Sequence, residues 1–393
     1  MRKGWEYKKL GEVCCPKSKI QRATKCFGGS DEILYIDISS IDNSVQEVNS
    51  ITSFTMSNAP SRAQQKVEYG DIIVSTVRPN LKNVAFIKQH DSNLVVSSGF
   101  CVLRTTDDIE RNYLFRYITS DIFTQHLMKL TTGANYPAVR DLDVRDSTIP
   151  LPPKSTQIEI VSELDKINEL IRLKKEQLKD FDNLAQSLFY EMFGDPVENE
   201  KGWEVKKLGE ICTDITDGDH MPPPKSESGI PFITISDIDK DTRCLNFENT
   251  FYVPEDYYNN LKENRKPQKG DLLYTVTGSY GIPVIVKTDK KFCFQRHIAL
   301  LRPNKEILST IFLCYWVLSD GVKFMADKVA TGIAQKTVGL NSIRKFSCIL
   351  PPLPLQQLFA QRIEQIEREK SEVQKSIQDL ETLLASRMQY WFE

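Results

Sequence analysis

The chain repeats its own sequence once. Gly-Trp-Glu-Tyr-Lys-Lys-Leu-Gly-Glu at 4–12 returns as Gly-Trp-Glu-Val-Lys-Lys-Leu-Gly-Glu at 202–210. Gly-Asp-Ile-Ile at 70–73 returns as Gly-Asp-Leu-Leu at 270–273, and Leu-Pro-Pro returns 199 residues later, from 151 to 350. Self-similarity at a fixed interval indicates a duplicated structural unit. Because two copies account for the 393 residues, the chain is predicted to be pseudo-symmetric and suited to a target with two halves.

The composition is that of an ordinary folded protein, with 40% hydrophobic and 26% charged residues. Each unit is long enough to bury a core. We see no apolar run long enough to span a membrane and no signal-peptide pattern at the start. The nine cysteines are an odd number and none forms a Cys-x-x-Cys pair. We therefore expect a reducing, cytoplasmic location without a disulfide framework or a zinc ribbon.

Acidic residues concentrate in two segments, 156–200 and 356–393, and the stretches before them are mildly basic. The net charge of −2 does not by itself indicate nucleic-acid binding. Acidic outer faces on these segments would repel DNA phosphates and remain available to a protein partner.

Both acidic segments carry the heptad pattern of a coiled coil. Residues in two rows, four residues apart, recur every seven positions, with polar breaks at Lys174, Lys370 and Arg387. Neither segment contains an internal Gly or Pro. The pattern predicts two helices of roughly 36 residues, or about 54 Å each. The apolar members of the rows are Ile160, Leu164, Ile167, Ile171, Leu178, Phe181, Ala185, Leu188 and Met192, then Phe359, Ile363, Ile366, Val373, Ile377, Leu380, Leu384 and Trp391.

A single helix of this kind would leave an apolar stripe in water. Since each helix follows one copy of the repeat, pseudo-two-fold symmetry predicts that the two pack antiparallel within one chain. A homodimeric coiled coil between chains is the alternative. If the helices hold the two copies apart, their length sets a spacer between the two halves of the target.

Proline pairs precede both helices and disfavour helix immediately before them. The Gly-Asp-Pro at 194–196 stops the first helix. These signals predict four segments: a recognition domain at 1–155, a spacer helix at 156–195, a second recognition domain at 196–354 and a second spacer helix at 355–393.

Each globular copy mixes strand and helix patterns, which predicts an α+β fold. The runs at 33–38 and 232–236 read as strands, and the Gly-Asp turns at 70 and 270 lead into strands. Amphipathic patterns predict a helix over 112–130 and another over 311–328.

The two copies differ most in the polar loops that follow equivalent strands. Arg, Lys, Asn, Gln, Ser and Tyr side chains in such loops can bind phosphates and base edges. Drift of solvated loops would also produce the difference. The candidate DNA-binding residues are Arg78, Asn80, Lys82, Asn135, Tyr136 and Arg140 in the first copy, and Thr277, Ser279, Tyr280, Arg296, Gln335 and Lys336 in the second.

Catalytic and cofactor signatures are missing. We find no dinucleotide or P-loop glycine motif, no Gly-x-Ser-x-Gly and no His-Glu-x-x-His. Asp217, Asp219 and His220 could ligate a metal, but Asp-Gly-Asp is also turn chemistry and the first copy lacks it. We therefore predict no catalytic residue, no metal and no cofactor in this chain.

Taken in order, these motifs resemble the specificity (S) subunit of type I restriction–modification systems, the HsdS family, over essentially the full length. The likeness rests on the Gly-Trp-Glu-x-x-Lys-Leu-Gly-Glu opening of each half and on the Thr-Thr-Gly-Ala-Asn-Tyr-Pro-Ala-Val-Arg run at 131–140. It also rests on the proline pairs followed by Gln157 and Gln356, and on the two matched helices. The Asp-Gly-Asp-His at 217–220 is similar to an Asp-Gly-Thr-His stretch of the family.

The resemblance implies two target-recognition domains, each reading one half of a split double-stranded DNA site. It implies antiparallel helices that dock methyltransferase (M) subunits, two of them by symmetry, and in some systems restriction (R) subunits. S-adenosylmethionine, ATP and Mg would then act in those partners. On this reading we expect Gln157, Gln356, Phe193 and Trp391 to contact the M subunit.

Two other functions remain open from the sequence. A coiled-coil adaptor would bind proteins without touching DNA. A self-sufficient nuclease or methyltransferase would need a cofactor loop or a metal triad.

Overall fold

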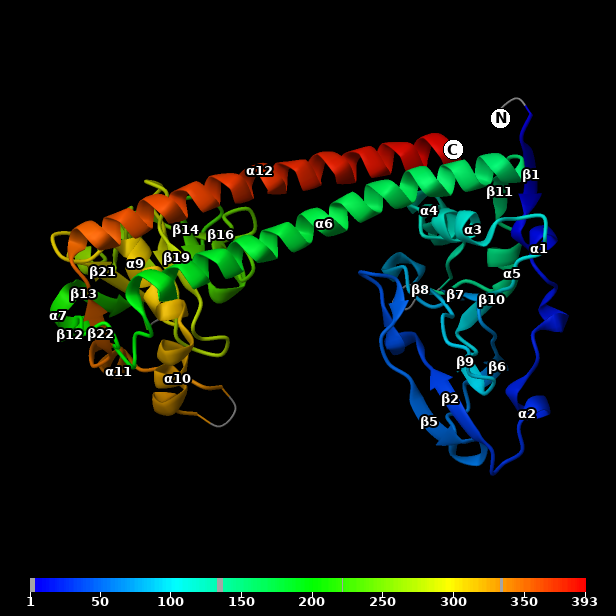
Figure 1. The fold of residues 1–393 in the computed structure, drawn as a ribbon, viewed down its shortest axis with the longest axis horizontal. Coiled ribbons are helices and arrows are strands. Elements are labelled where there is room, and N and C mark those ends of the chain that lie inside the picture. The colour runs from blue at the N-terminus through cyan, green and yellow to red at the C-terminus, as the bar shows by residue number, and fades with distance from the viewer. Residues whose placement is uncertain (1–3, 133–136, 221, 333–334) are drawn as a thin grey trace. The chain divides into compact units, whose positions relative to one another are not determined.

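The structure is a computed structural model that describes residues 4–132, 137–220, 222–332 and 335–393. The chain divides into two compact units. Unit 1 comprises Met1–Lys174 with Ser376–Glu393, and unit 2 comprises Lys175–Lys375. Each unit therefore contains one globular copy of the repeat, which we call its head, together with part of both long helices (Figure 1).

The two predicted helices are present and slightly longer than expected. Helix α6 spans Lys154–Phe193 and α12 spans Leu353–Phe392, each 40 residues long. The apolar heptad positions are buried or half-buried. In unit 1, Ile160 is 1% exposed and Leu164 is fully buried; in unit 2, Ala185 is 1% exposed and Phe359 is fully buried.

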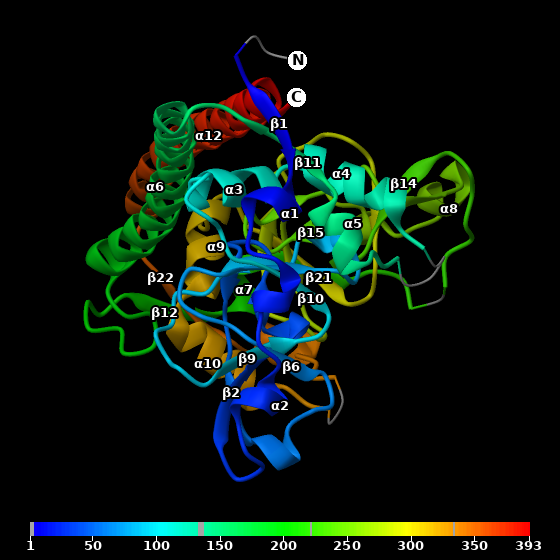
Figure 2. The same ribbon diagram turned by 90° about the vertical axis from the view of Figure 1, so that its right-hand side faces the viewer.

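The helices pair antiparallel within the chain, as predicted, and they run side by side in both views (Figures 1 and 2). In unit 2, Lys370 Nζ donates to Asp182 at 2.8 Å, and the Phe193 and Phe359 rings meet edge to face at 5.3 Å between centroids. Residues late in α6 therefore lie opposite residues early in α12.

The same pairing occurs in unit 1. The Arg387 guanidinium donates to both carboxylate oxygens of Glu163, at 2.9 Å for the Nη2 bond, and Trp391 Nε1 donates to Glu163 at 3.0 Å. Two of the polar heptad positions, Lys370 and Arg387, thus carry ion pairs to the facing helix instead of apolar contacts.

The proline-glutamine pattern explains how both helices begin. Gln157 is 1% exposed; its amide donates to Pro152 O and its Oε1 accepts from Glu110 N at 2.7 Å. Gln356 repeats this, donating to Pro351 O and accepting from Ser309 N at 2.9 Å. Because one side chain satisfies backbone groups on two segments, it fixes each long helix to its head.

The head of unit 1 contains short strands and helices in an α+β arrangement, as predicted. One antiparallel pair, β1 with β11, places Glu6 opposite Leu151. A four-stranded sheet has the order β5-β2-β9-β6, with β2 parallel to β9, and a three-stranded sheet has the order β10-β7-β8. The elements are β1 (Glu6–Lys9), α1 (Leu10–Val13), η1 (Lys17–Lys19), α2 (Ala23–Cys26), β2 (Glu32–Ile36), η2 (Ile38–Ser40), β3 (Ile41–Asp42), β4 (Glu47–Val48), β5 (Thr52–Thr55), η3 (Met56–Asn58), β6 (Ala63–Lys66), β7 (Ile72–Ser75), η4 (Pro79–Leu81), β8 (Val84–Phe86), β9 (Leu94–Ser97), β10 (Phe100–Leu103), α3 (Arg111–Ile118), α4 (Asp121–Leu130), α5 (Asp141–Arg145) and β11 (Thr148–Leu151).

The head of unit 2 repeats this plan with altered edges. β12 pairs with β22, a four-stranded sheet has the order β13-β21-β18-β19, and β14 lies between β17 and β20. β14 runs parallel to β20, as β2 does to β9. The elements are β12 (Glu204–Lys207), α7 (Leu208–Ile211), β13 (Cys212–Asp217), β14 (Ile230–Ile233), η5 (Ile235–Asp237), β15 (Ile238–Asp239), β16 (Cys244–Leu245), β17 (Phe251–Val253), α8 (Glu255–Asn259), η6 (Glu263–Arg265), β18 (Leu272–Thr275), β19 (Pro283–Ile285), β20 (Cys293–Phe294), β21 (Ile298–Pro303), α9 (Thr310–Leu318), α10 (Asp320–Val329), α11 (Leu340–Arg344) and β22 (Ser347–Leu350).

One prediction was wrong in both copies. The helix expected over 112–130 is two helices, α3 and α4, and the helix expected over 311–328 is α9 and α10. A serine ends the first helix of each pair. Ser120 Oγ donates to Tyr117 O at 2.6 Å and accepts from Phe123 N at 3.2 Å, which starts α4. Ser319 Oγ donates to Trp316 O at 2.7 Å in the same way. A serine that bonds its own backbone competes with the helix ladder.

The repeated Gly-Asp turn serves the same structural role in both heads. Gly70 and Gly270 have φ of +88° and +95°, a conformation that glycine adopts without strain. The following Asp71 is 1% exposed and accepts two hydrogen bonds from Arg104, both at 2.8 Å. Asp271 accepts the equivalent pair from Arg302 at 3.0 and 2.9 Å. Each pair links the turn to the end of the neighbouring antiparallel strand, β10 in unit 1 and β21 in unit 2.

An aromatic cluster should make Phe359 a major contributor to the stability of unit 2. Its ring contacts the rings of Phe189, Phe193 and Tyr315 and is fully buried. We expect Phe359→Ala to lower the free energy of unfolding by about 3–5 kcal/mol, because a large cavity would remain.

Chemical denaturation followed by circular dichroism measures this loss. The neighbouring Leu358, whose side chain is 42% exposed, provides the matched control. Leu358→Ala should change stability by less than about 0.5 kcal/mol. Equal effects of the two substitutions would contradict the packing described here.

The Glu163 contacts in unit 1 should make stability depend on pH. Hydrogen bonds from Arg387 and Trp391 lower the pKa of the Glu163 carboxyl below its ordinary value. A carboxyl whose pKa is lower in the folded state stabilises the fold above its unfolded pKa, and this contribution is lost as the pH falls through the folded pKa.

We expect Glu163→Gln to cost about 1 kcal/mol at neutral pH. The difference from the unmodified chain should begin to shrink as the pH falls through the ordinary carboxyl pKa of about 4.3, and it should disappear only below the lowered folded pKa, where Glu163 is protonated in both states. Urea unfolding at several pH values tests this. Glu159→Gln, on an exposed position of the same helix, should show no difference at any pH. A Glu163→Gln effect that persists unchanged in acid would refute the role of the ion pair.

Candidate nucleic-acid interface

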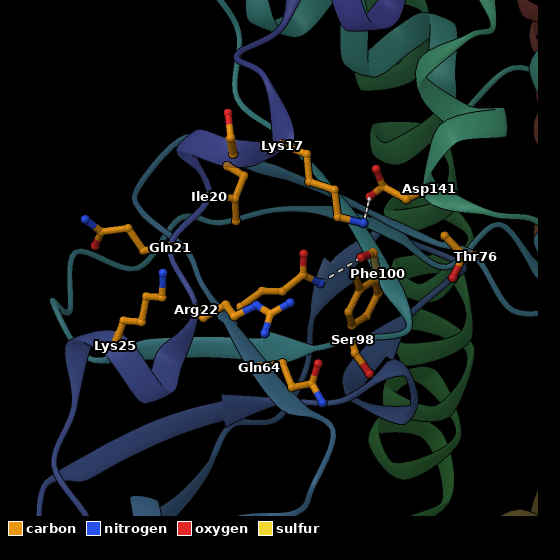
Figure 3. Close-up of a pocket in the computed structure, with 12 residues that line it drawn as sticks. Lys17, Ile20, Gln21, Arg22, Lys25, Gln64, Thr76, Ser98, Phe100 and Asp141 are labelled. Carbon is orange, nitrogen blue, oxygen red and sulfur yellow. Dashed lines mark hydrogen bonds and ion pairs between the residues drawn. The ribbon is translucent and has the colours of Figure 1, made fainter.

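The head of unit 1 contains a polar hollow of about 850 Å³ (Figure 3). Its walls come from η1, α2, β6, the turn before β10 and the start of α5. Figure 3 shows Arg22 and Gln64 directed toward the same space, with Lys17 above them. The residues that line it are Lys17, Ser18, Ile20, Gln21, Arg22, Lys25, Gln64, Gln65, Thr76, Ser98, Phe100 and Asp141.

Backbone pairing holds the cationic wall against the wall formed by β6. The segment before α2 bridges to β6 at Arg22 and Gln65, and Lys66 N donates to Gln21 O at 2.9 Å. Gln65 lies behind the surface and donates to Ser97 O at 3.1 Å and to Phe100 O at 2.8 Å. Since Gln65 is used internally, its neighbour Gln64 is the exposed amide at this position.

The hollow has an excess of positive charge. Lys17, Arg22 and Lys25 line it, and Asp141 is its one carboxylate. Asp141 accepts from Arg145 Nε at 2.9 Å and lies 3.4 Å from Lys17 Nζ. Because Arg145 already balances Asp141, the lysine and arginine charges of the hollow remain available to an anionic ligand.

Arg145 fixes the floor of the hollow. This side chain is buried, and besides Asp141 it donates to Cys15 O at 3.0 Å and to Val102 O at 2.7 Å. It therefore ties the segment that carries Lys17 to strand β10. Burial raises the pKa of the adjacent Cys14 thiol to about 12, so this cysteine is a neutral core residue near pH 7.

The corresponding segment of unit 2 has the opposite charge. After α7 the chain carries Asp214, Asp217 and Asp219 where unit 1 carries lysines and arginine. Asp217 lies 3.1 Å from His220 Nε2 and 3.5 Å from Arg265, and Asp219 accepts from the Tyr257 hydroxyl at 3.2 Å. The two heads thus present different chemistry on one framework.

The loops predicted to bind DNA are brought together in unit 1. Val77 bridges to Ala138, and Arg78 N donates to Pro137 O at 2.7 Å, so the loops around 78 and 140 are neighbours. Arg78 and Asn80 are exposed. Lys82 pairs with Asp121 at 2.6 Å. Asn135 and Tyr136 lie outside the described residues.

Arg140 also lies in this loop cluster. Its side chain is 78% exposed and binds both oxygens of Asp143, which lowers the pKa of that carboxyl. The cluster at 78–82 and 138–140 adjoins the hollow at Thr76, whose backbone accepts from Val139 N at 2.9 Å, and at Asp141, which follows Arg140. The predicted residues of unit 1 and the hollow are therefore neighbouring but separate sets.

Unit 2 joins its loops in the same way. Thr277 bridges to Thr337, and Gly278 N donates to Lys336 O at 2.9 Å. Gln335 and Lys336 are exposed. Thr277 is only 7% exposed, and its hydroxyl bonds that of Thr337 at 3.2 Å. Thr277 therefore holds the loops together, and its predicted contact with DNA is corrected to a structural role.

The other predicted residues of unit 2 lie near these loops or in the turn between β20 and β21. Ser279 is exposed and accepts from Lys240 at 3.2 Å. The Tyr280 hydroxyl donates to Asp327, which raises the pKa of the phenol and keeps it protonated. Arg296 is exposed beside His297, and burial lowers the pKa of that imidazole.

Three of the four predicted partner-binding residues face the interior. Gln157 and Gln356 are 1% and 0% exposed and bond the backbone, and Phe193 is fully buried against Phe312. With no surface to offer, these three are corrected to structural residues. Trp391 is half-buried and stacks on Trp5 with 6.2 Å between ring centroids.

Within the ranges that the structure describes, no three His, Cys, Asp or Glu side chains are grouped closely enough to hold a metal ion. In the same residues, no helix is long and apolar enough to cross a membrane.

Sequence reasoning missed the cationic hollow, although a signal was present. From Val13 to Ser30 the chain contains four lysines and arginines and no acidic residue. The net charge of the whole segment 1–155 does not show this run, because acidic residues elsewhere in the segment offset it. A comparison of the two copies position by position would have shown it, because the matching stretch of the second copy holds three aspartates.

Comparison with known proteins decides the family. The family model described as type I restriction modification DNA specificity domain matches twice, at residues 2–180 and 200–382. The chain belongs to this family. It is a specificity subunit of the type I restriction–modification kind, and the expectations of that family and of a two-domain α+β fold are confirmed.

Relatives and a solved structure agree over most of the chain. The type I restriction enzyme MjaIX specificity subunit of Methanocaldococcus jannaschii is 23% identical over 73% of this chain and 68% of its own length. The StySPI specificity subunit of Salmonella potsdam is 21% identical over 84% of this chain and 74% of its own. A solved structure described as the structural basis of complex assembly and conformational transition of the type I R-M system superposes with a TM-score of 0.69, at 28% identity, over 99% of this chain and 97% of that one. The homologues are non-catalytic recognition subunits, and neither the adaptor nor the self-sufficient enzyme finds support.

Proposed function

We propose that each head reads one half of a bipartite double-stranded DNA target. The observation that carries this proposal is the cationic hollow of unit 1, in a chain whose family is defined by a DNA specificity domain. The duplication supports the bipartite target, because the heads share a framework and differ in the charge of the segment after the first short helix.

In unit 1 the hollow supplies both classes of contact that sequence-specific binding needs. Arg22 and Gln64 carry the side-chain types that bind guanine and adenine edges with paired hydrogen bonds. Lys17 and Lys25 are exposed point charges suited to phosphates, which position a protein on the duplex without reading sequence. Arg78, Asn80, Lys82 and Arg140 extend this surface, and Asn135 and Tyr136 belong to the same proposal.

In unit 2 we propose that Ser279, Tyr280, Arg296, Gln335 and Lys336 form the reading surface. Support comes from the joined loops and from the exposure of Arg296, Gln335 and Lys336. Base choice there should differ from that of unit 1, because the neighbouring aspartates can accept hydrogen bonds but cannot donate them when ionised.

The second part of the proposal is that methyltransferase subunits dock on this chain. Its pseudo-symmetry favours two of them. Helix α6 leaves an apolar row exposed in unit 1: Ile158 is 54% exposed, and Leu170 and Leu173 are each 47% exposed. A hollow of about 740 Å³ lies along this row. Exposed apolar patches on a folded chain mark sites of protein association. Trp391 adds a partly exposed aromatic ring to the docking surface. The methyltransferase partners would supply S-adenosylmethionine chemistry, and a restriction subunit would use ATP and Mg.

The salt dependence of DNA binding tests the phosphate contacts. Replacing Lys17 and Lys25 together by Ala should weaken binding by the complex of this chain with its methyltransferase. It should also reduce the slope of log K against log salt by about 2, since each lost phosphate contact on duplex DNA contributes about 0.9.

Replacing Lys88 and Lys129, which are exposed outside the hollow, provides a control with the same charge change. Titrations of labelled duplex at several salt concentrations measure both variants. If both variants reduce the slope of log K against log salt by the same amount, the hollow is not the phosphate site.

Methylation mapping tests the assignment of half-sites. Arg22→Ala with Gln64→Ala in unit 1 should relax base choice in one half of the target only. Gln335→Ala with Lys336→Ala in unit 2 should relax the other half only. Single-molecule methylation sequencing of cells that carry each variant with its methyltransferase reads out the modified sites. Relaxation of both halves by one variant would contradict separate readers.

A further inference from the structure

Unit 2 contains a second hollow, of about 610 Å³, on the side of its head that packs against α12. Its walls come from β19, α9 and the first half of α12. Apolar side chains form its floor, including Val286, Cys314 and Ile363, which are 1%, 6% and 3% exposed. A largely apolar hollow of this size, with a few polar groups at its edge, is the usual form of a small-molecule site. None of the residues proposed to bind DNA lines it.

The same place in unit 1 is filled by the protein itself. Strand register makes Phe86 equivalent to Ile285, because they lie opposite Ile72 and Leu272. Phe115 is equivalent to Cys314. Each lies five residues after the residue, Glu110 or Ser309, whose backbone N–H donates to the glutamine at the start of the long helix. In unit 1 the Phe86 and Phe115 rings stack with 4.2 Å between centroids.

A cation completes the filling of unit 1. The Arg111 guanidinium lies 5.9 Å from the Phe86 ring centroid and 5.5 Å from that of Tyr69. The equivalent position in unit 2, also the first residue of its helix, is Thr310. Unit 2 thus has Ile, Cys and Thr where unit 1 has two phenyl rings and a guanidinium. The difference in side-chain volume accounts for the hollow.

The rim of the unit 2 hollow is positively charged. Lys269, Lys287, Arg243 and Arg368 line it together with two carboxylates, Glu364 and Glu367. Within the described ranges, Lys287 and Arg368 have no ion-pair partner. Burial raises the pKa of the Cys314 thiol to about 12, so the wall it forms is neutral at physiological pH.

We propose that this hollow binds a small aromatic anion, and that unit 2 therefore carries a ligand site that unit 1 lacks. The aromatic part would occupy the volume that Phe86 and Phe115 fill in unit 1. The anionic group would lie at Lys287 and Arg368. The proposal concerns a site separate from the DNA-reading surface and holds whether or not the half-site assignment is correct.

Binding of 8-anilinonaphthalene-1-sulfonate to the full-length chain under native conditions tests the proposal. The unmodified chain should bind one equivalent with enhanced fluorescence. Ile285→Phe with Cys314→Phe, which rebuilds the filling of unit 1, should weaken binding at least tenfold. Phe86→Ile with Phe115→Cys, which empties unit 1, should raise the stoichiometry to two.

A charge reversal keeps the test valid if a core substitution unfolds the protein. Lys287 is exposed, so Lys287→Glu should leave the fold intact and weaken probe binding several-fold. Lys290→Glu, an equally exposed lysine three residues on that does not line the hollow, should leave binding unchanged. Circular dichroism confirms that each variant is folded.

Two outcomes would overturn the proposal. In the first, the probe binds equally to the unmodified chain, the filled variant and Lys287→Glu. In the second, all probe is displaced when the methyltransferase subunit binds, which would show that a protein surface occupies the hollow.

Discussion

The fold depends on closing two apolar helical stripes against each other. Neither α6 nor α12 could stand alone in water with its heptad rows exposed. Their antiparallel pairing gives each unit the beginning of one helix and the end of the other. In unit 2, Phe193 at the end of α6 packs on Phe312, and in unit 1, Phe392 at the end of α12 packs on Tyr113. In unit 1 a residue more than 200 positions beyond the head therefore completes its core, and in unit 2 the completing residue comes from the helix that precedes the head.

A second constraint joins the helices to the heads and is repeated in both copies. The glutamine near the start of each helix bonds the backbone of its own head, and a buried Asp–Arg pair holds each Gly-Asp turn. A buried charge pair is costly to break, because removing one partner leaves an unpaired charge in the interior. These anchors leave the loop tips free to vary. Recognition can therefore change in one head while the scaffold stays the same, and the charge contrast after the first short helix is an example.

Much of this architecture could be predicted from the sequence, and the failures have clear physical causes. Heptads, the proline pairs and the repeat itself identified both long helices and their pairing, since these signals extend over many residues. Periodicity could not show the breaks at Ser120 and Ser319, because a serine that caps a new helix interrupts the chain without changing the apolar pattern. The cationic hollow was missed since its lysines and arginine come from one segment, 17–25, while Gln64 comes from β6 and Ser98 from the turn before β10, which only the fold brings alongside.

The corrected partner residues show how a duplicated chain should be interpreted. Gln157, Gln356 and Phe193 were assigned to a partner from the family resemblance, yet their recurrence in the two copies reflects internal contacts that each copy of the fold makes. Differences between equivalent positions are more informative about function, because packing does not require them. A change of polarity on a loop alters what a surface can recognise. Protein interiors are normally packed closely by their own side chains. A smaller side chain within such a framework, as at Cys314, therefore leaves space that another molecule can occupy.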